Sequence, residues 1–285
     1  MTVRPLSTLL LLVDATSAEQ WRDALIEAAD GGGFEVISGP ASQTFEPQHP
    51  TVVISDDVNW TVHIPAARTH VFADGDLPAT PSAPGSFDDR HELHKESRRL
   101  VVAAHVIAEG ATLHGRGSVE AEIDGVGIAK RLGQGVRSAV ESPLSIYADL
   151  PPKPGVSAHW PPHLFSYQSE AFIDGSPDID LTGRPRMLLH GPYAFLPTGR
   201  WRADIRFAIA PEGGAAPLRI QWGKDGDFAT SEFRIVQAGE YSVSLEHDWN
   251  EPAPAQVVIW LTEAVFRGYL IYRGCSIEMT AELKA

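Results

Sequence analysis

Cysteine is almost absent from this sequence, and its scarcity limits the chemistry available. Cys275 is the only cysteine among 285 residues, so the chain can form neither an intramolecular disulfide bond nor a zinc site built on several thiolates. Cys275 lies in a stretch of alternating apolar and polar residues, which predicts a buried thiol. We therefore expect it to serve packing rather than catalysis.

Long apolar runs and an excess of basic charge are missing as well. No run approaches the ~20 apolar residues that a membrane-spanning helix needs. The net charge of −14 disfavours phosphate backbones and anionic lipid surfaces as partners. Residues 9–13 are apolar but lack a basic start and end at Asp14, so they favour a first strand over the core of a signal peptide. We predict a cytoplasmic protein that binds neither nucleic acid nor membrane.

Motifs for cofactors and for common catalytic centres are also lacking. Gly115-Arg-Gly117 and Gly125-Val-Gly127 do not have the spacing of dinucleotide or phosphate loops, and no Gly-x-Ser-x-Gly elbow occurs. His91 and His94 are three residues apart, whereas the zincin motif needs four. We therefore predict no cofactor, and no metal on these histidines.

Proline-rich stretches divide the chain into two parts. Hydrophobic residues make up 43% of the sequence, which is enough for sizeable cores, and the length fits two domains. Residues 143–163 contain Pro151-Pro-Lys-Pro154 and Trp160-Pro-Pro162. We predict a first domain over residues 1–142, a linker over 143–163, and a second domain over 164–285.

The first domain has the alternating pattern of an α/β layer. Short apolar strands are expected over residues 9–13, 34–37, 51–54 and 70–73. A helix is expected after Ser17 as its N-cap, and a longer one over residues 88–109. This order predicts a Rossmann-like fold with a parallel sheet. Residues 110–142 show no clear pattern.

Acidic residues follow the expected strands of the first domain. They are Asp14, Asp56, Asp74 and Asp76. The carboxyl ends of parallel strands meet at one edge of a sheet, where such side chains bind a divalent cation. Asp74-Gly-Asp76 also resembles the Asp-x-Asp element of metal-dependent glycosyltransferases that use nucleotide sugars. A glycan-acting enzyme with its site at this edge is therefore one alternative, beside the simpler interpretation of solvated loop aspartates.

The second domain consists of alternating segments with turns between them. From Trp201 to Ile209 every second residue is apolar, the period of a half-buried strand, and Leu196-Pro-Thr-Gly199 before it is a turn sequence. Similar segments are found at residue 172 and over 187–196, 218–222, 233–236, 241–245, 257–261 and 269–279. About eight antiparallel strands without helices predict a two-sheet sandwich, most simply a jelly roll.

Three stretches of the second domain carry a family resemblance. Residues 191–207 (GPYAFLPTGRWRADIRF), 239–245 (GEYSVSL) and 268–277 (GYLIYRGCSI) resemble the lectin-like jelly rolls of carbohydrate-binding modules. They are especially similar to accessory sandwiches attached to bacterial polysaccharide-biosynthesis proteins. The resemblance covers about residues 166–282. It implies a role in sugar binding or assembly, and it transfers no catalytic residue.

A sugar site needs an exposed aromatic ring beside fixed polar groups, because a pyranose has apolar faces and a rim of hydroxyls. Trp260, between inward Ile259 and Leu261, is expected to point outward. The other candidates for the same surface are Tyr193, Arg202, Arg206, Trp249 and Tyr269.

The leading hypothesis is a non-catalytic carbohydrate-binding protein that serves the synthesis of bacterial surface polysaccharides. The enzyme described above is the first alternative, with a divalent cation as its cofactor. A structural module that forms a homo-oligomer is the second, because an outer aromatic can also be covered by another subunit.

Overall fold

The computed structural model describes residues 7–13, 15–41, 45–73, 87–115, 118–131, 142–168, 172–173 and 176–283. The chain divides into two compact units. The first comprises Met1–Leu77 with Arg99–Val140, and the second comprises Pro78–Arg98 with Glu141–Ala285. Among the described residues, no helix is both long and apolar enough to cross a membrane.

A parallel sheet is the centre of the first unit. Its strands are β1 (Ser7–Leu12), β2 (Glu35–Ser38), β3 (Thr51–Ser55), β4 (Thr69–Phe72) and β5 (Thr112–His114), in the spatial order β2-β3-β1-β4-β5. Every neighbouring pair is parallel. Two 3-10 helices, η1 (Val58–Val62) and η2 (Ala66–Arg68), lie between β3 and β4. β1 and β3 are buried on both faces, which explains their continuous apolar sequences.

Helix α1 (Ala15–Gly31) buries one apolar stripe in the first unit. Trp21 and Leu25 have no exposed surface, and the Trp21 ring lies 4.8 Å from that of Phe72 on the sheet. The hairpin of β6 (Glu120–Ile123) and β7 (Gly127–Lys130) adds Ala121 and Ile123 to this core. Burial of large apolar side chains contributes about 1.5–3 kcal/mol each.

Three sequence expectations for the first unit need comment. The α/β character and the parallel sheet are confirmed, but β3 lies beside β1, whereas a doubly wound dinucleotide-binding fold places β2 there. The strand order therefore does not support the Rossmann-like label. α1 begins at Ala15, so Ser17 lies inside the helix rather than at its N-cap. The unassigned residues 110–142 contain β5, β6 and β7.

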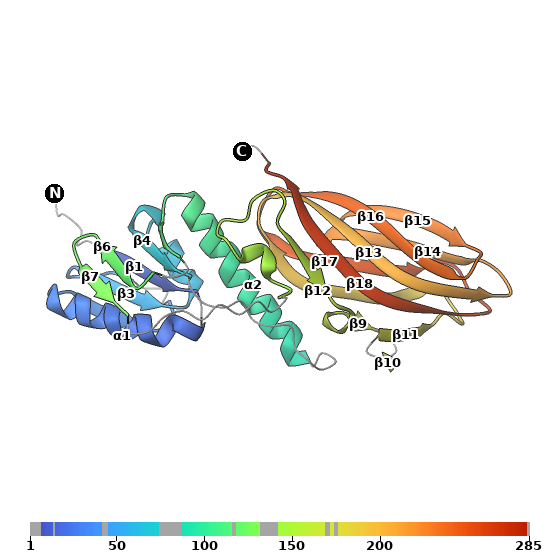
Figure 1. The fold of residues 1–285 in the computed structure, drawn as a ribbon, viewed down its shortest axis with the longest axis horizontal. Helices are drawn as coiled ribbons and strands as arrows, with labels where there is room; N and C mark the ends of the chain where they lie inside the picture. The colour runs from blue at the N-terminus through green and yellow to red at the C-terminus, as the bar shows by residue number, and fades with distance from the viewer. Residues whose placement is uncertain are drawn as a thin grey trace. The chain divides into compact units, whose positions relative to one another are not determined.

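The second unit is a β-sandwich (Figure 1). One layer, here called the Trp260 sheet, contains β9 (Ser166–Tyr167), β12 (Arg186–Leu196), β14 (Ala216–Lys224), β15 (Asp227–Ile235) and β17 (Ala253–Leu261), in the order β15-β14-β17-β12-β9. The other, here called the Arg202 sheet, contains β8 (Ser157–Trp160), β10 (Phe172–Ile173), β11 (Ser176–Asp180), β13 (Gly199–Glu212), β16 (Gly239–Trp249) and β18 (Arg267–Ala281). Its order is β10-β11-β18-β13-β16, and β8 also pairs with β18.

Buried tryptophans join the inner faces of these two sheets. Trp222 of the Trp260 sheet lies 5.8 Å from Trp160 and 5.0 Å from Trp249, both on the Arg202 sheet, measured between ring centroids. Its Nε1 donates to the backbone oxygen of Trp201 at 3.2 Å. All four rings are fully buried. The period-two pattern of the sequence therefore gives the expected inner core.

The boundary region belongs largely to the sandwich. Within residues 143–163, which the sequence predicts as a linker, lie η3 (Ser145–Tyr147), β8 and the start of η4 (Pro162–Leu164). β8 pairs with β18 from Ser157 to Trp160. Helix α2 (Phe87–Ala108) is divided between the units, with its residues up to Arg98 in the second unit.

Candidate functional site

Strand alternation separates the residues that the sequence predicts as one sugar site. Trp260 faces outward from the Trp260 sheet, between buried Ile259 and Leu261. Arg202, Arg206 and Tyr269 face outward from the Arg202 sheet, which is the opposite side of the sandwich. The structure therefore does not bring these four side chains together.

Trp249 belongs to neither outer face. Its ring has no exposed surface and packs against Trp222 and His247, each at 5.0 Å between centroids. A sugar ring needs a free aromatic face to stack on. Trp249 is therefore a core residue, because it lies at an inward position of β16.

The Trp260 indole is exposed but held in one orientation. It is 36% exposed, and its Nε1 donates to Oε1 of Gln221 on β14 at 3.0 Å. In the strand register Arg219 lies directly opposite Trp260 on one side and Met187 on the other. Arg219 Nε in turn donates to Glu232 Oε1 on β15 at 2.7 Å. The result is an aromatic platform beside an amide, a guanidinium and a carboxylate.

A second group lies on the same face, beside Trp260. His190 on β12 is paired in register with Val258, which lies two residues before Trp260 on β17 and on the same side of the strand. His190 Nδ1 lies 2.6 Å from the Tyr193 hydroxyl oxygen. Burial lowers the pKa of His190, and nearby Arg90 lowers it further, whereas burial raises the pKa of Tyr193. At neutral pH the imidazole is therefore uncharged and the phenol is protonated.

The first half of α2 covers the β9–β12 end of this sheet. Arg90 Nη1 donates to the Ser166 hydroxyl at 2.9 Å and to the Phe165 carbonyl at 3.1 Å. His94 Nδ1 lies 3.0 Å from the Tyr193 carbonyl oxygen. The contact with the Tyr193 carbonyl gives the His94 side chain a structural role that needs no metal ion.

The outer face of the Arg202 sheet consists of paired charges. Arg202 Nη2 donates to Glu278 Oε2 at 2.6 Å, and Arg200 Nε donates to Asp248 Oδ1 at 2.7 Å. Arg206 is exposed between Ser242 and Gly274 and has no hydrogen-bond or ion-pair partner among the described residues. Tyr269 is 42% exposed and lies opposite Ala210 and Asp180. This face has an exposed ring, but no amide is paired with it.

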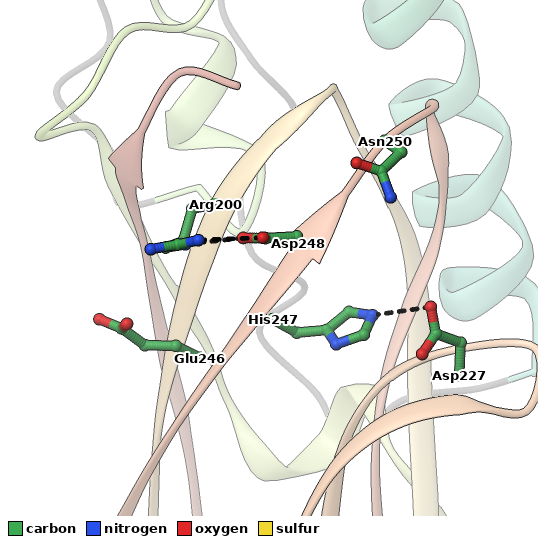
Figure 2. Close-up of a pocket in the computed structure, with 6 residues that line it drawn as sticks. All are labelled: Arg200, Asp227, Glu246, His247, Asp248 and Asn250. Atoms are coloured by element: carbon green, nitrogen blue, oxygen red, sulfur yellow. Dashed lines mark hydrogen bonds and ion pairs between the residues drawn. The ribbon is translucent and has the colours of Figure 1, made fainter. Parts of the chain in front are cut away.

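A hollow of about 450 Å³ lies at the edge of the sandwich where β15 and β16 meet (Figure 2). Its lining residues are Arg200, Asp227, Glu246, His247, Asp248 and Asn250. His247 Nε2 lies 3.4 Å from Asp227 Oδ2, and Figure 2 shows this pair beside the Arg200–Asp248 pair. The lining is polar and has no phenyl or indole face, so it offers hydrogen bonds without a platform for stacking.

The acidic residues of the first unit are only partly described. Asp14, Asp74 and Asp76 lie outside the described residues. Asp56 forms an ion pair with Arg99, which neutralises its charge. In the described part of the chain, no three His, Cys, Asp or Glu side chains are grouped as metal ligands would be. The glycosyltransferase-like alternative stays a prediction.

The first unit also contains a histidine pair, buried His70 and partly buried His114, that is absent from the sequence predictions. His70 Nδ1 lies 3.0 Å from His114 Nε2, and the rings stack at 5.3 Å. Burial lowers the pKa of both, and lowers that of His114 to about 4. Both imidazoles are neutral at pH 7. Their pairing depends on the parallel register of β4 and β5.

Of the residues described on the Trp260 face, Trp260 and Tyr193 are among the candidates predicted from the sequence, whereas Arg219, Gln221 and His190 are not. The only signal available was that each occupies an outward position in an alternating strand. Which outward positions become neighbours depends on the pairing order β14-β17-β12, and strands of similar pattern can pair in many orders.

No protein-family model and no curated protein matches the chain. Among solved structures, it is similar to a family 61 carbohydrate-binding module in complex with β-1,4-galactotriose, at 9% identity over 36% of this chain and 70% of that one, with a TM-score of 0.30. It is similar to a second module of carbohydrate-binding family 16 at 12% identity, over 37% and 92%, with a TM-score of 0.27. The CBM22-1 xylan-binding domain from Paenibacillus barcinonensis Xyn10C overlaps at 10% identity, over 46% and 99%, with a TM-score of 0.28. The neighbours are not all of this kind: dimeric latent PorU from Porphyromonas gingivalis is similar at 7% identity, over 47% of this chain and 13% of that one, with a TM-score of 0.27.

Proposed function

We propose that the second unit binds carbohydrate on the outer face of the Trp260 sheet. The observation that carries the proposal is the exposed Trp260 indole, held in place by the Gln221 amide at 3.0 Å. A pyranose ring stacks its apolar face on such a platform without further ordering of the side chain. Holding the ring before binding reduces the entropy lost when the ligand arrives.

The polar neighbours of Trp260 suit the rim of a sugar. Arg219 presents N–H donors and Glu232 presents acceptor oxygens, and each is fixed by the other at 2.7 Å. Hydroxyl groups both donate and accept, so a paired cation and anion serve them without an excess of either charge. The edge hollow lacks an apolar platform, which is why we assign the sugar to the Trp260 face.

The test is a comparison of two exposed aromatics on opposite sides of the same sandwich. Wild type, Trp260→Ala and Tyr269→Ala are screened on a glycan array, and the best ligand is then titrated by calorimetry. We expect Trp260→Ala to weaken binding by about tenfold or more, which corresponds to ~1.4 kcal/mol. Tyr269→Ala serves as the matched control and should bind as wild type does. Equal affinities of the two variants, or no glycan bound at all, would refute the proposal.

We propose in addition that the ligand is a bacterial surface polysaccharide, bound during its synthesis in the cytoplasm. The support is the sequence resemblance of residues 191–207, 239–245 and 268–277 to accessory sandwiches of biosynthesis proteins. An array that carries both bacterial capsular glycans and plant wall glycans tests this part separately. Binding restricted to the plant glycans would overturn it and leave the carbohydrate proposal intact.

A further inference from the structure

Tyr193 has an unusual backbone conformation. Its φ is +66°, in the left-handed region that a bulky residue rarely occupies. Contacts at both ends of the residue hold it there: the carbonyl oxygen lies 3.0 Å from His94 Nδ1, and the hydroxyl oxygen lies 2.6 Å from His190 Nδ1. The conformation thus places the phenol against the imidazole of a residue on the Trp260 face.

One nitrogen of His190 is left available by this arrangement. Nδ1 is engaged by Tyr193, and Nε2 has no hydrogen-bond partner among the described residues. If the protonated phenol donates to Nδ1, the imidazole proton must reside on Nε2, because a neutral imidazole carries only one. His190 then offers an N–H donor whose tautomer is set by Tyr193.

His190 and Trp260 are close enough to contact the same ligand. Trp260 lies opposite Met187, and Val258, two residues along β17, lies opposite His190. Diagonal neighbours on one face of an antiparallel pair are about 7–8 Å apart. Val258, which lies between them in the register, is only 5% exposed, so the neighbouring side chains already cover it. A second ring linked to one stacked on Trp260 would lie above these side chains, at the level of the His190 imidazole.

We infer that His190 donates a hydrogen bond from Nε2 to a hydroxyl of this second ring and that Tyr193 is its positioning residue. The ligand class is then an oligosaccharide of at least two linked rings, rather than a monosaccharide. The inference rests on the proposed function, because the first ring is the one stacked on Trp260. It adds a second subsite and a preference for chain length.

The binding experiment compares disaccharides with their monosaccharides. Cellobiose, xylobiose and β-1,4-galactobiose are titrated against wild type beside glucose, xylose and galactose. In wild type we expect the best disaccharide to bind at least about tenfold more tightly than its monosaccharide. In His190→Ala this ratio should fall to near one while the monosaccharide affinity is unchanged. His159→Ala, which removes a histidine from the Arg202 sheet, should keep the wild-type ratio.

A second measurement reads the tautomer without any ligand. Long-range ¹H–¹⁵N correlation spectra of histidine-labelled protein distinguish a proton on Nε2 from one on Nδ1. We expect the Nε2–H form of His190 in wild type and a mixture of tautomers in Tyr193→Phe, with a several-fold smaller disaccharide preference. His190 in the same tautomer in both proteins would refute the positioning role.

The failures of the two proposals can be told apart. If Trp260→Ala binds every saccharide as wild type does, the stacking site itself is wrong and this inference is refuted with it. If Trp260→Ala abolishes binding but His190→Ala keeps the disaccharide preference, only the second subsite is wrong.

Discussion

The two outer faces of the sandwich are built by the same alternation of residues but have different chemistry. On the Arg202 sheet, the outward side chains form ion pairs across strands, such as Arg202 with Glu278. The Trp260 sheet has such pairs as well, Arg219 with Glu232 among them, but it also presents an indole held by an amide and an imidazole held by a phenol. Exposed ion pairs contribute little to stability, and their charged groups already bind each other. An exposed ring held by an amide keeps a free face for a ligand. Period-two alternation makes both faces, and residue identity distinguishes the Trp260 face, which we propose as the binding face, from the charged one.

The largest effect is expected where the two sheets meet. Trp222→Ala removes the ring that contacts Trp160 and Trp249 and should destabilise the sandwich by about 3–5 kcal/mol. Both faces then weaken together, because they share this core. Urea unfolding followed by circular dichroism measures the loss, and Tyr269→Ala is the exposed control. A loss below about 1 kcal/mol would show that the rings do not join the sheets.

A smaller effect is expected when one arginine on each face is replaced by alanine. Arg219→Ala should weaken glycan binding about tenfold, because a charged hydrogen-bond donor beside Trp260 is lost. Arg202→Ala, which breaks an exposed pair on the other face, should leave binding unchanged and cost at most about 1 kcal/mol of stability. Calorimetric titration with the best array ligand measures the first, and urea unfolding the second. Equal losses of affinity would contradict the assignment of the site.

The two faces should also respond to acid in different pH ranges. The folded-state pKa of His190 is lowered, so below the ordinary value of about 6.5 the unfolded chain binds more protons and stability falls as pH falls. The hydrogen bond from Arg200 lowers the pKa of Asp248, so that contribution is lost only below about pH 4.

The variant His190→Gln tests the contribution of His190 to the pH dependence of stability. Between pH 6.5 and 5, the unfolding free energy of this variant should change less steeply with pH than that of wild type. The difference between the two slopes should be smaller than ~1.4 kcal/mol per pH unit, the value for one full proton. His70 and His114 titrate in the same direction in both proteins and cancel in the difference. Identical slopes would mean that His190 titrates alike in the folded and unfolded states.

The smallest effect is expected when an indole is added to the charged face. Arg206→Trp places a ring between Ser242 and Gly274, where no side-chain amide is paired with it. In a Trp260→Ala background this change should not restore glycan binding on the array. Restored affinity would show that an exposed indole alone is sufficient and that the Gln221 contact is dispensable.

Much of the fold was predictable because apolar periodicity is a local property. The four predicted strands of the first half correspond to β1–β4, the helix predicted over residues 88–109 is α2, and the alternating segments of the second half are strands of the two sandwich sheets. β8, β9 and β11 were missed. Each is short, and β8 lies in a proline-rich stretch that resembles a linker.

The candidate site was less predictable because it depends on strand pairing. Trp260 was predicted to face outward, and it does, but Tyr269 and Arg202 are on the opposite side. The predicted strand ends at Leu245, but β16 continues to Trp249, and the period-two pattern that places Val243 and Leu245 inward then places Trp249 inward too. His190 and Gln221 carry no local signal that relates them to Trp260.

The sequence by itself determined the division into an α/β part and an all-β part, the inward core positions of the long strands, and the lack of disulfides. These follow from the spacing of neighbouring residues and from composition. Only the tertiary structure decided which outward side chains share a face, because strand pairing joins residues more than a hundred positions apart, such as Ser157 and Glu278. Any of several pairings would satisfy the same local pattern.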